Sequence, residues 1–104
     1  MSFEVRWSPE ALEDLLRLHD FLLERAATVV ELEAADRAIE AVETSAKALL
    51  ARAPFSCRKA GDRITRRELV MPFGSTGYVL LFEIVGAAGV LVLAVRHQRE
   101  QDYH

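Results

Sequence analysis

The chain has 104 residues, of which 51% are hydrophobic and 28% are charged, and its formal net charge is −3. This apolar content excludes an intrinsically disordered chain, and the length accommodates one domain over residues 1–104 but no dinucleotide-binding fold of several βαβ units. The single cysteine, Cys57, excludes an internal disulfide and a multi-cysteine zinc site. We therefore expect a reducing, cytoplasmic setting, with no metal and no cofactor.

The charged residues are unevenly divided between the two halves of the chain. Residues 1–50 carry 5 basic and 11 acidic side chains, whereas residues 51–104 carry 8 basic and 5 acidic ones. The overall balance disfavours a general nucleic-acid coat, although the C-terminal half can present a local basic surface. The uncharged run over residues 84–95 is too short to span a bilayer, so we expect no membrane partner.

The N-terminal segment predicts one strand and the start of a helix. Phe3, Val5 and Trp7 alternate with charged residues, which is the pattern of a half-buried strand. Ser8 is a suitable N-cap and Pro9 suits the first helical position, so we expect a helix from there to about residue 27. The apolar face expected for this helix consists of Leu12, Leu15, Leu16, His19, Leu22, Leu23 and Ala26.

A second helix is predicted over residues 30–52, and its apolar stripe is rich in alanine. The short junction around Thr28 makes the two helices an antiparallel hairpin, and Pro54 ends the second helix. Small residues on the stripe allow the helices to approach closely. The residues expected on it are Leu32, Ala35, Ile39, Val42, Ala46, Leu49 and Leu50.

Three strands are predicted after the polar connector over residues 54–62. They span residues 64–71, 78–85 and 90–97, and the last two are apolar on both faces, which places them centrally in a sheet. The expected fold is therefore α+β in the order β-α-α-β-β-β. The N-terminal helical hairpin packs on one face of a roughly four-stranded, mainly antiparallel sheet. The opposite face is left open, or is covered by the C-terminal tail or by a partner.

Basic residues of the C-terminal half gather in two places and form the candidate functional site. The first cluster is Arg63, Arg66 and Arg67, and the second is Arg96, His97, Arg99 and Tyr103. Arg66 and Arg67 point to opposite faces of their strand, so we expect only one of them to join a site on the open face. The chain has no P-loop, GxGxxG or HExxH motif.

Two interpretations of these basic residues remain open. Cleavage of RNA by its own 2′-hydroxyl needs a proton acceptor, a proton donor and cations. His97 is suitable as the acid or base, and the suitable cations are Arg66, Arg96 and Arg99. Alternatively, the arginines form structural ion pairs, and the available carboxylates are Glu68, Glu83, Glu100 and Asp102. His19 is expected to be a packed histidine of the helical core.

Four segments of the chain resemble the ParE/RelE superfamily of type II toxin–antitoxin toxins. They are Val5-Arg6-Trp7-Ser8-Pro9-Glu10-Ala11, Arg67-Glu68-Leu69-Val70-Met71-Pro72-Phe73-Gly74, Gly77-Tyr78-Val79-Leu80-Leu81-Phe82 and Leu93-Ala94-Val95-Arg96-His97-Gln98-Arg99-Glu100. The likeness covers nearly the whole chain. It implies two N-terminal helices packed against an antiparallel sheet.

The resemblance also implies a cognate antitoxin, which folds on the toxin surface in the groove between helices and sheet. The apolar residues assigned to this contact are Leu15, Leu22, Tyr78, Leu80 and Phe82. Operator DNA is then expected to be a partner only indirectly, through the antitoxin.

Three functions are compatible with the resemblance. A ParE-like toxin inhibits DNA gyrase by binding, with Arg67, Arg96, His97, Arg99 and Tyr103 as target contacts. A RelE-like toxin cleaves mRNA on the ribosome, with His97, Arg66, Arg96 and Tyr103 as catalytic residues. A non-toxic binding module retains the fold alone. The negative net charge disfavours a ribosome binder, so the ParE-like function is preferred.

Overall fold

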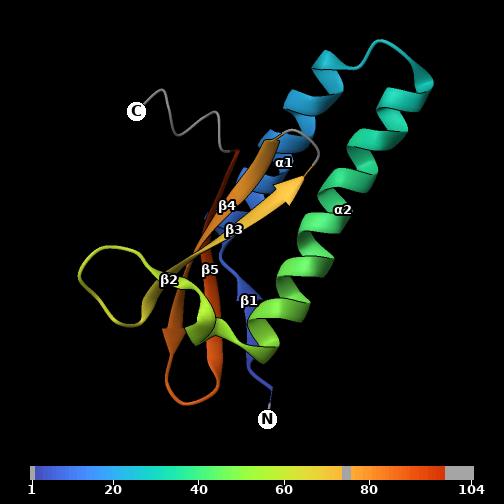
Figure 1. The fold of residues 1–104 in the computed structure, drawn as a ribbon. Coiled ribbons are helices and arrows are strands. Elements are labelled where there is room, and N and C mark those ends of the chain that lie inside the picture. The colour runs from blue at the N-terminus through green and yellow to red at the C-terminus, as the bar shows by residue number, and fades with distance from the viewer. Residues whose placement is uncertain (1, 74–75, 98–104) are drawn as a thin grey trace.

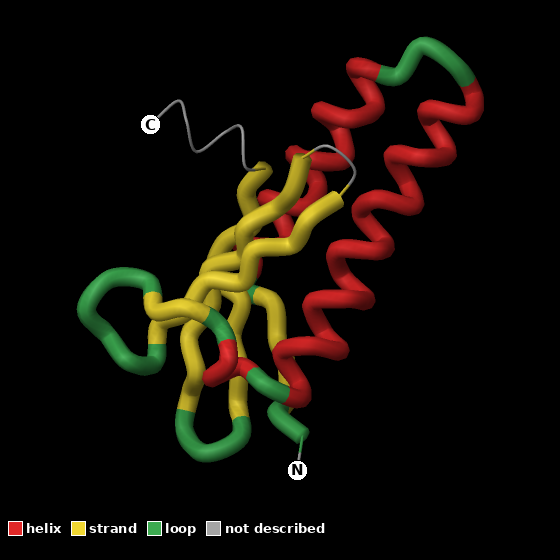
Figure 2. The backbone as a smooth tube through the Cα atoms, in the orientation of Figure 1, coloured by secondary structure: helices red, strands yellow, loops and turns green. Residues whose placement is uncertain are grey.

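A computed structural model describes residues 2–73 and 76–97 (Figures 1 and 2). Two helices, α1 (Pro9–Arg25) and α2 (Val29–Arg52), form the hairpin, and a short 3-10 helix, η1 (Pro54–Ser56), follows. The strands are β1 (Glu4–Trp7), β2 (Arg58–Lys59), β3 (Arg66–Phe73), β4 (Thr76–Val85) and β5 (Gly89–His97). No helix within the described ranges is long and apolar enough to cross a membrane.

The five strands form one sheet in the order β1-β5-β4-β3-β2. Strand β1 pairs in parallel with β5, and the other neighbours are antiparallel. The predicted α+β class and element order are confirmed, and the sheet has one strand more than expected. The additional strand, β2, lies in the predicted connector and pairs Arg58 with Glu68 and Lys59 with Arg67. Two residues are too few to show a periodic pattern.

Both helices begin at side-chain caps. The Ser8 hydroxyl accepts a hydrogen bond from the backbone N–H of Ala11 at 3.0 Å, as its position before Pro9 predicts. The Thr28 hydroxyl accepts from Glu31 at 3.1 Å and so starts α2 at Val29. These caps fix where the two helices begin, and the hairpin lies along one side of the sheet (Figure 1).

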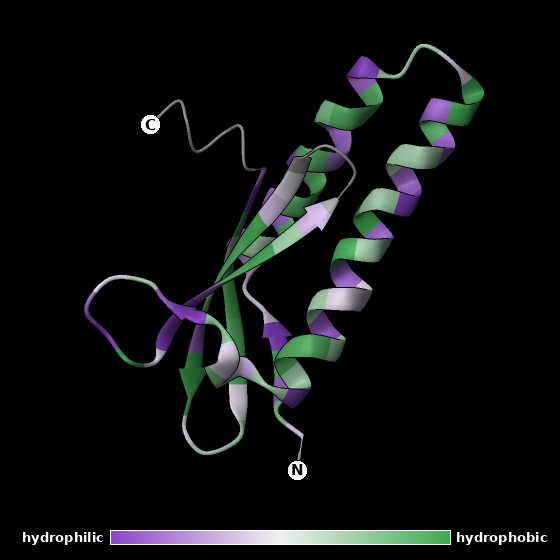
Figure 3. Ribbon diagram, viewed as in Figure 1, coloured by the Kyte–Doolittle hydropathy of each residue, from purple (hydrophilic) through white to green (hydrophobic). Residues whose placement is uncertain are grey.

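The predicted apolar face of α1 was wrong in its rotation. The side chains buried against the sheet belong to Ala11, Leu15 and Leu18, whereas Leu12 and Leu16 are 48% and 66% exposed. Leucines occupy several directions around this helix, and the sheet selects the line through residues 11, 15 and 18. Figure 3 shows that hydrophobic and hydrophilic residues alternate along both helices.

Helix α2 keeps most of its predicted stripe. Its buried side chains belong to Ala35, Ala38, Val42, Ala46 and Leu50. Leu32 and Leu49, which were also expected there, are 42% and 36% exposed. Three alanines on the buried line let α2 approach the rest of the core closely, because they add little volume.

The two faces of the sheet differ in what covers them. Tyr78, Leu80, Phe82 and Ile84 of β4 point under the helices and are at most 3% exposed. Residues at the odd-numbered positions of β4 point to the opposite face, which no described helix covers, although Val79 on that face is only 4% exposed. We call this second surface the open face.

Candidate functional site

Arg66 lies on the open face, where it pairs with Glu83 of the neighbouring strand. The distance from Arg66 Nε to Glu83 Oε2 is 3.0 Å, and Arg63 Nη2 lies 2.9 Å from Glu83 Oε1. The Thr65 hydroxyl donates to the same carboxylate at 2.9 Å. Burial would raise the pKa of Glu83, but the Thr65 hydroxyl and the two guanidinium groups outweigh it and lower that pKa. The expected ion pairing with Glu83 is thus confirmed.

Arg67 points to the helix side and binds backbone carbonyl groups. Its Nε donates to the Ile64 carbonyl at 2.7 Å, and its Nη1 donates to the carbonyls of Cys57 and Phe55 at 2.8 and 3.3 Å. The guanidinium also lies 5.4 Å from the centre of the Phe55 ring. Burial raises the pKa of the adjacent Cys57 thiol, despite opposing effects of Ser56 and Arg67. Arg67 therefore fastens the segment before β3.

His97 is buried on the helix side of the sheet, with 6% of its surface exposed. Its ring centre lies 5.5 Å from that of Tyr78 in an edge-to-face arrangement and 6.2 Å from that of Phe21 on α1. The Arg25 guanidinium carbon in turn lies 4.4 Å above the Phe21 ring. Burial raises the pKa of Tyr78. The imidazole thus packs between α1 and β4.

Arg96 is exposed on the open face, opposite Val79 of β4. Arg66 shares that face but lies opposite Glu83, four positions further along the same strand. At about 3.3 Å per residue, this places the two arginines roughly 13 Å apart along the strand direction alone. His97 points to the other side, so these three side chains do not converge on one site. Arg99 and Tyr103 lie outside the described residues.

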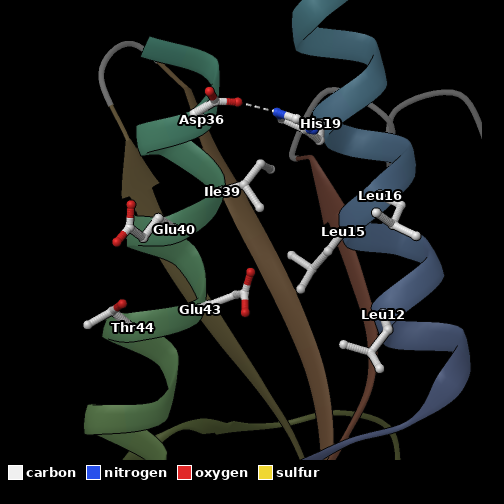
Figure 4. A pocket seen from close by; sticks show the side chains of 9 residues that line it. All are labelled: Leu12, Leu15, Leu16, His19, Asp36, Ile39, Glu40, Glu43 and Thr44. Atoms are coloured by element: carbon white, nitrogen blue, oxygen red, sulfur yellow. Dashed lines mark hydrogen bonds and ion pairs between the residues drawn. The ribbon is translucent and has the colours of Figure 1, made fainter. Parts of the chain in front are cut away.

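A groove of about 480 Å³ runs between the outer faces of α1 and α2 (Figure 4). Leu12, Leu16 and Ile39 supply its apolar part. At one end His19 Nε2 and Asp36 Oδ1 are 2.6 Å apart, which joins the helices directly. His19 was expected to be a packed core histidine, but its side chain is 29% exposed and lines the groove.

The residues predicted to bind the antitoxin are mostly buried. Leu15 contributes to its lining but is 4% exposed, and Leu22 is half-buried. Tyr78, Leu80 and Phe82 are core residues with at most 1% exposure, so they support the helices and present no surface to a partner.

Sequence reasoning missed the acidic side of the groove. Asp36, Glu40 and Glu43 of α2 line it opposite the α1 leucines. Their spacing of four and three residues places them on one helix face, which is the signal that could have identified them. Neither these residues nor any other three His, Cys, Asp or Glu side chains of residues 2–73 and 76–97 gather as metal ligands do.

Comparison with known proteins adds three findings. A family model described as the ParE toxin of the type II toxin–antitoxin system, parDE, matches residues 5–102. A curated relative, Toxin RelE3 from Caulobacter vibrioides, is 35% identical over 97 residues, which cover 93% of this chain and 96% of that protein. A solved structure, the chromosomal ParDE TA system from P. aeruginosa, has a similar fold. Its TM-score is 0.69 at 17% identity, over 91% of this chain and 95% of that one.

Proposed function

We propose that this chain, which belongs to the ParE/RelE superfamily of type II toxin–antitoxin toxins, arrests growth by binding DNA gyrase. The observation that carries the proposal is the separation of its candidate catalytic groups. His97 is buried between Phe21 and Tyr78, whereas Arg66 and Arg96 lie on the open face. A nuclease needs its acid or base and its phosphate-binding cations around the same scissile phosphate. Inhibition by binding has no such requirement.

In this proposal the target contacts are Arg96, Arg99 and Tyr103, at and beyond the end of β5. His97 supports them from the helix side, where it packs against Phe21 of α1. Arg67, the other residue predicted to contact the target, pairs with Phe82 near the opposite end of the sheet and holds the segment before β3. The ParE family model that spans most of the chain also favours a gyrase target over an mRNA target.

Ribosome-dependent cleavage of mRNA is the second candidate, favoured by the name of the relative Toxin RelE3. It requires His97 to act as acid or base. That role needs the imidazole to leave its position between α1 and β4 when substrate binds.

We further propose that a cognate antitoxin neutralises the toxin and that its binding segment lies in the groove between α1 and α2. The exposed side chains of Leu12 and Leu16 support this site, because a soluble protein gains by covering such apolar surface. Leu15 and Leu22 then lie beneath or beside the bound segment. Operator DNA is reached only through the antitoxin.

The deciding experiment adds purified toxin to a gyrase supercoiling assay and, separately, to ribosomes translating a defined mRNA. We expect supercoiling to be inhibited and the mRNA to remain intact. The variant Arg96→Ala/Arg99→Ala should lose inhibition, whereas the control Arg37→Ala/Lys47→Ala on α2 should retain it. If gyrase is not inhibited and the mRNA is cleaved, and if His97→Gln abolishes that cleavage, the chain is a nuclease instead.

A further inference from the structure

The segment from Arg58 to Thr65 consists of strand β2 and the turn that connects it to β3, and we call this whole segment the loop. Figure 1 shows it projecting away from both helices. None of its side chains is buried, so the loop contributes little to the hydrophobic core. Ordering an exposed loop costs conformational entropy of about 1–2 kcal/mol per residue, and burial does not offset that cost here. Polar contacts must therefore hold the loop in place.

Two side chains hold the base of the loop from opposite faces of the sheet. On the helix side, Arg67 binds the carbonyl of Cys57 before the loop and the carbonyl of Ile64 near its end. On the open face, Glu83 accepts from Thr65 and pairs with Arg63. Because Glu83 is only 14% exposed, these contacts are shielded from solvent more than ordinary surface ion pairs are.

The loop thus presents basic and apolar groups in a fixed arrangement. Arg58 and Arg63 are 61% and 64% exposed, and each meets a carboxylate through one nitrogen. The remaining N–H groups of each guanidinium are available to a partner. Lys59 is exposed as well, and Ile64 exposes 64% of its surface beside them. Asp62 is the single carboxylate within the loop.

We infer that this loop is a second docking element for the protein target, that it binds an acidic surface of that protein, and that Arg67 and Glu83 are its positioning residues. The inference rests on the proposed function. Arginine is enriched at protein interfaces, and the exposed Ile64 supplies apolar area beside Arg63. A polyanion such as DNA is disfavoured because the chain has a net charge of −3. A loop held in place before binding loses less entropy when it binds.

The test measures the affinity of purified toxin for purified gyrase. The variant Lys59→Ala/Arg63→Ala should bind at least tenfold more weakly, and its remaining binding should depend less on salt concentration. The control Arg37→Ala/Lys47→Ala removes one arginine and one lysine from α2 and should bind within twofold of the wild type. Thermal unfolding of each variant confirms that it is folded.

Arg67→Lys tests the positioning role, because lysine keeps the charge but lacks the forked donors. It should weaken binding several-fold, and its effect should not add to that of Lys59→Ala/Arg63→Ala. If the losses of binding free energy in the two variants add fully, the positioning role of Arg67 is refuted, since Arg67 would then act independently of the loop.

The outcomes separate this inference from the proposed function. If the wild type binds gyrase and the loop variant binds it equally well, the inference is overturned and the gyrase proposal stays intact. Absence of wild-type binding overturns the gyrase proposal, and the loop inference with it. If the wild type binds a DNA duplex without gyrase as tightly as it binds gyrase, and the loop variant does not bind that duplex, the assignment to an acidic protein surface is overturned.

Discussion

Replacement of Asp14 by alanine should destabilise the protein through one hydrogen bond between α1 and β5. Strand β1 ends at Trp7, so among the described residues the β5 backbone beyond Val92 has no strand partner on that side. The Asp14 side chain replaces the missing strand as hydrogen-bond acceptor, because its Oδ2 accepts from the Val95 N–H at 2.9 Å. Val95 is fully buried, so alanine at position 14 leaves a buried donor unpaired. An unpaired buried donor costs about 1–3 kcal/mol.

This loss corresponds to a fall in melting temperature of between about 4 and 20 °C for a domain of this size. Urea denaturation followed by circular dichroism measures the free energy directly. Asp14→Asn retains an acceptor oxygen and should lose less than half as much. Glu13→Ala, an exposed neighbour on the same turn, controls for removal of a carboxylate from the helix. Equal stability of Asp14→Ala and Glu13→Ala would refute the role assigned to the hydrogen bond.

Three further predictions concern packing, acid stability and a turn. Leu18→Ala should cost about 2–5 kcal/mol because it leaves a core cavity, whereas exposed Leu16→Ala should stay within about 0.5 kcal/mol in the same urea titration. The lowered pKa of Glu83 stabilises the fold above pH 4.5, the ordinary pKa, and this contribution is lost as pH falls through the folded value. The free energy of unfolding of Glu83→Gln should therefore change less with pH below pH 4.5 than that of the wild type does. Gly89→Ala would place its Cβ 2.8 Å from a backbone oxygen and should lower the melting temperature more than Gly86→Asn, since Asn tolerates positive φ.

The caps and the main elements could be predicted from sequence because their signals are local. Ser8 before Pro9 marks the start of α1, alternation marks β1, and continuous apolar runs mark β4 and β5. The rotation of α1 could not be predicted in this way, because leucines at positions 12, 15, 16 and 18 point in several directions around the helix. Only contact with the sheet decides which of them are buried. The short strand β2 likewise exists through its partner β3 and not through its own pattern.

Assignment of Arg96 and His97 to faces depended on a bulge that leaves no signal in the sequence. Phe82 pairs with Val92, but the preceding residue, Leu81, pairs with Ala94, so one residue of β5 is extra. Regular alternation from Val92 would place Arg96 under the helices and His97 on the open face. The bulge exchanges them.

The residues that hold this bulge belong to the start of α1, far from it in sequence. The Ser8 hydroxyl lies 3.3 Å from the Leu93 carbonyl, and Asp14 binds the Val95 N–H. The same contacts that stabilise the junction of α1 and β5 therefore determine that an arginine, and not a histidine, faces outward at the end of β5. It follows that Asp14→Ala should weaken target binding by the Arg96 surface even at temperatures where the variant remains folded.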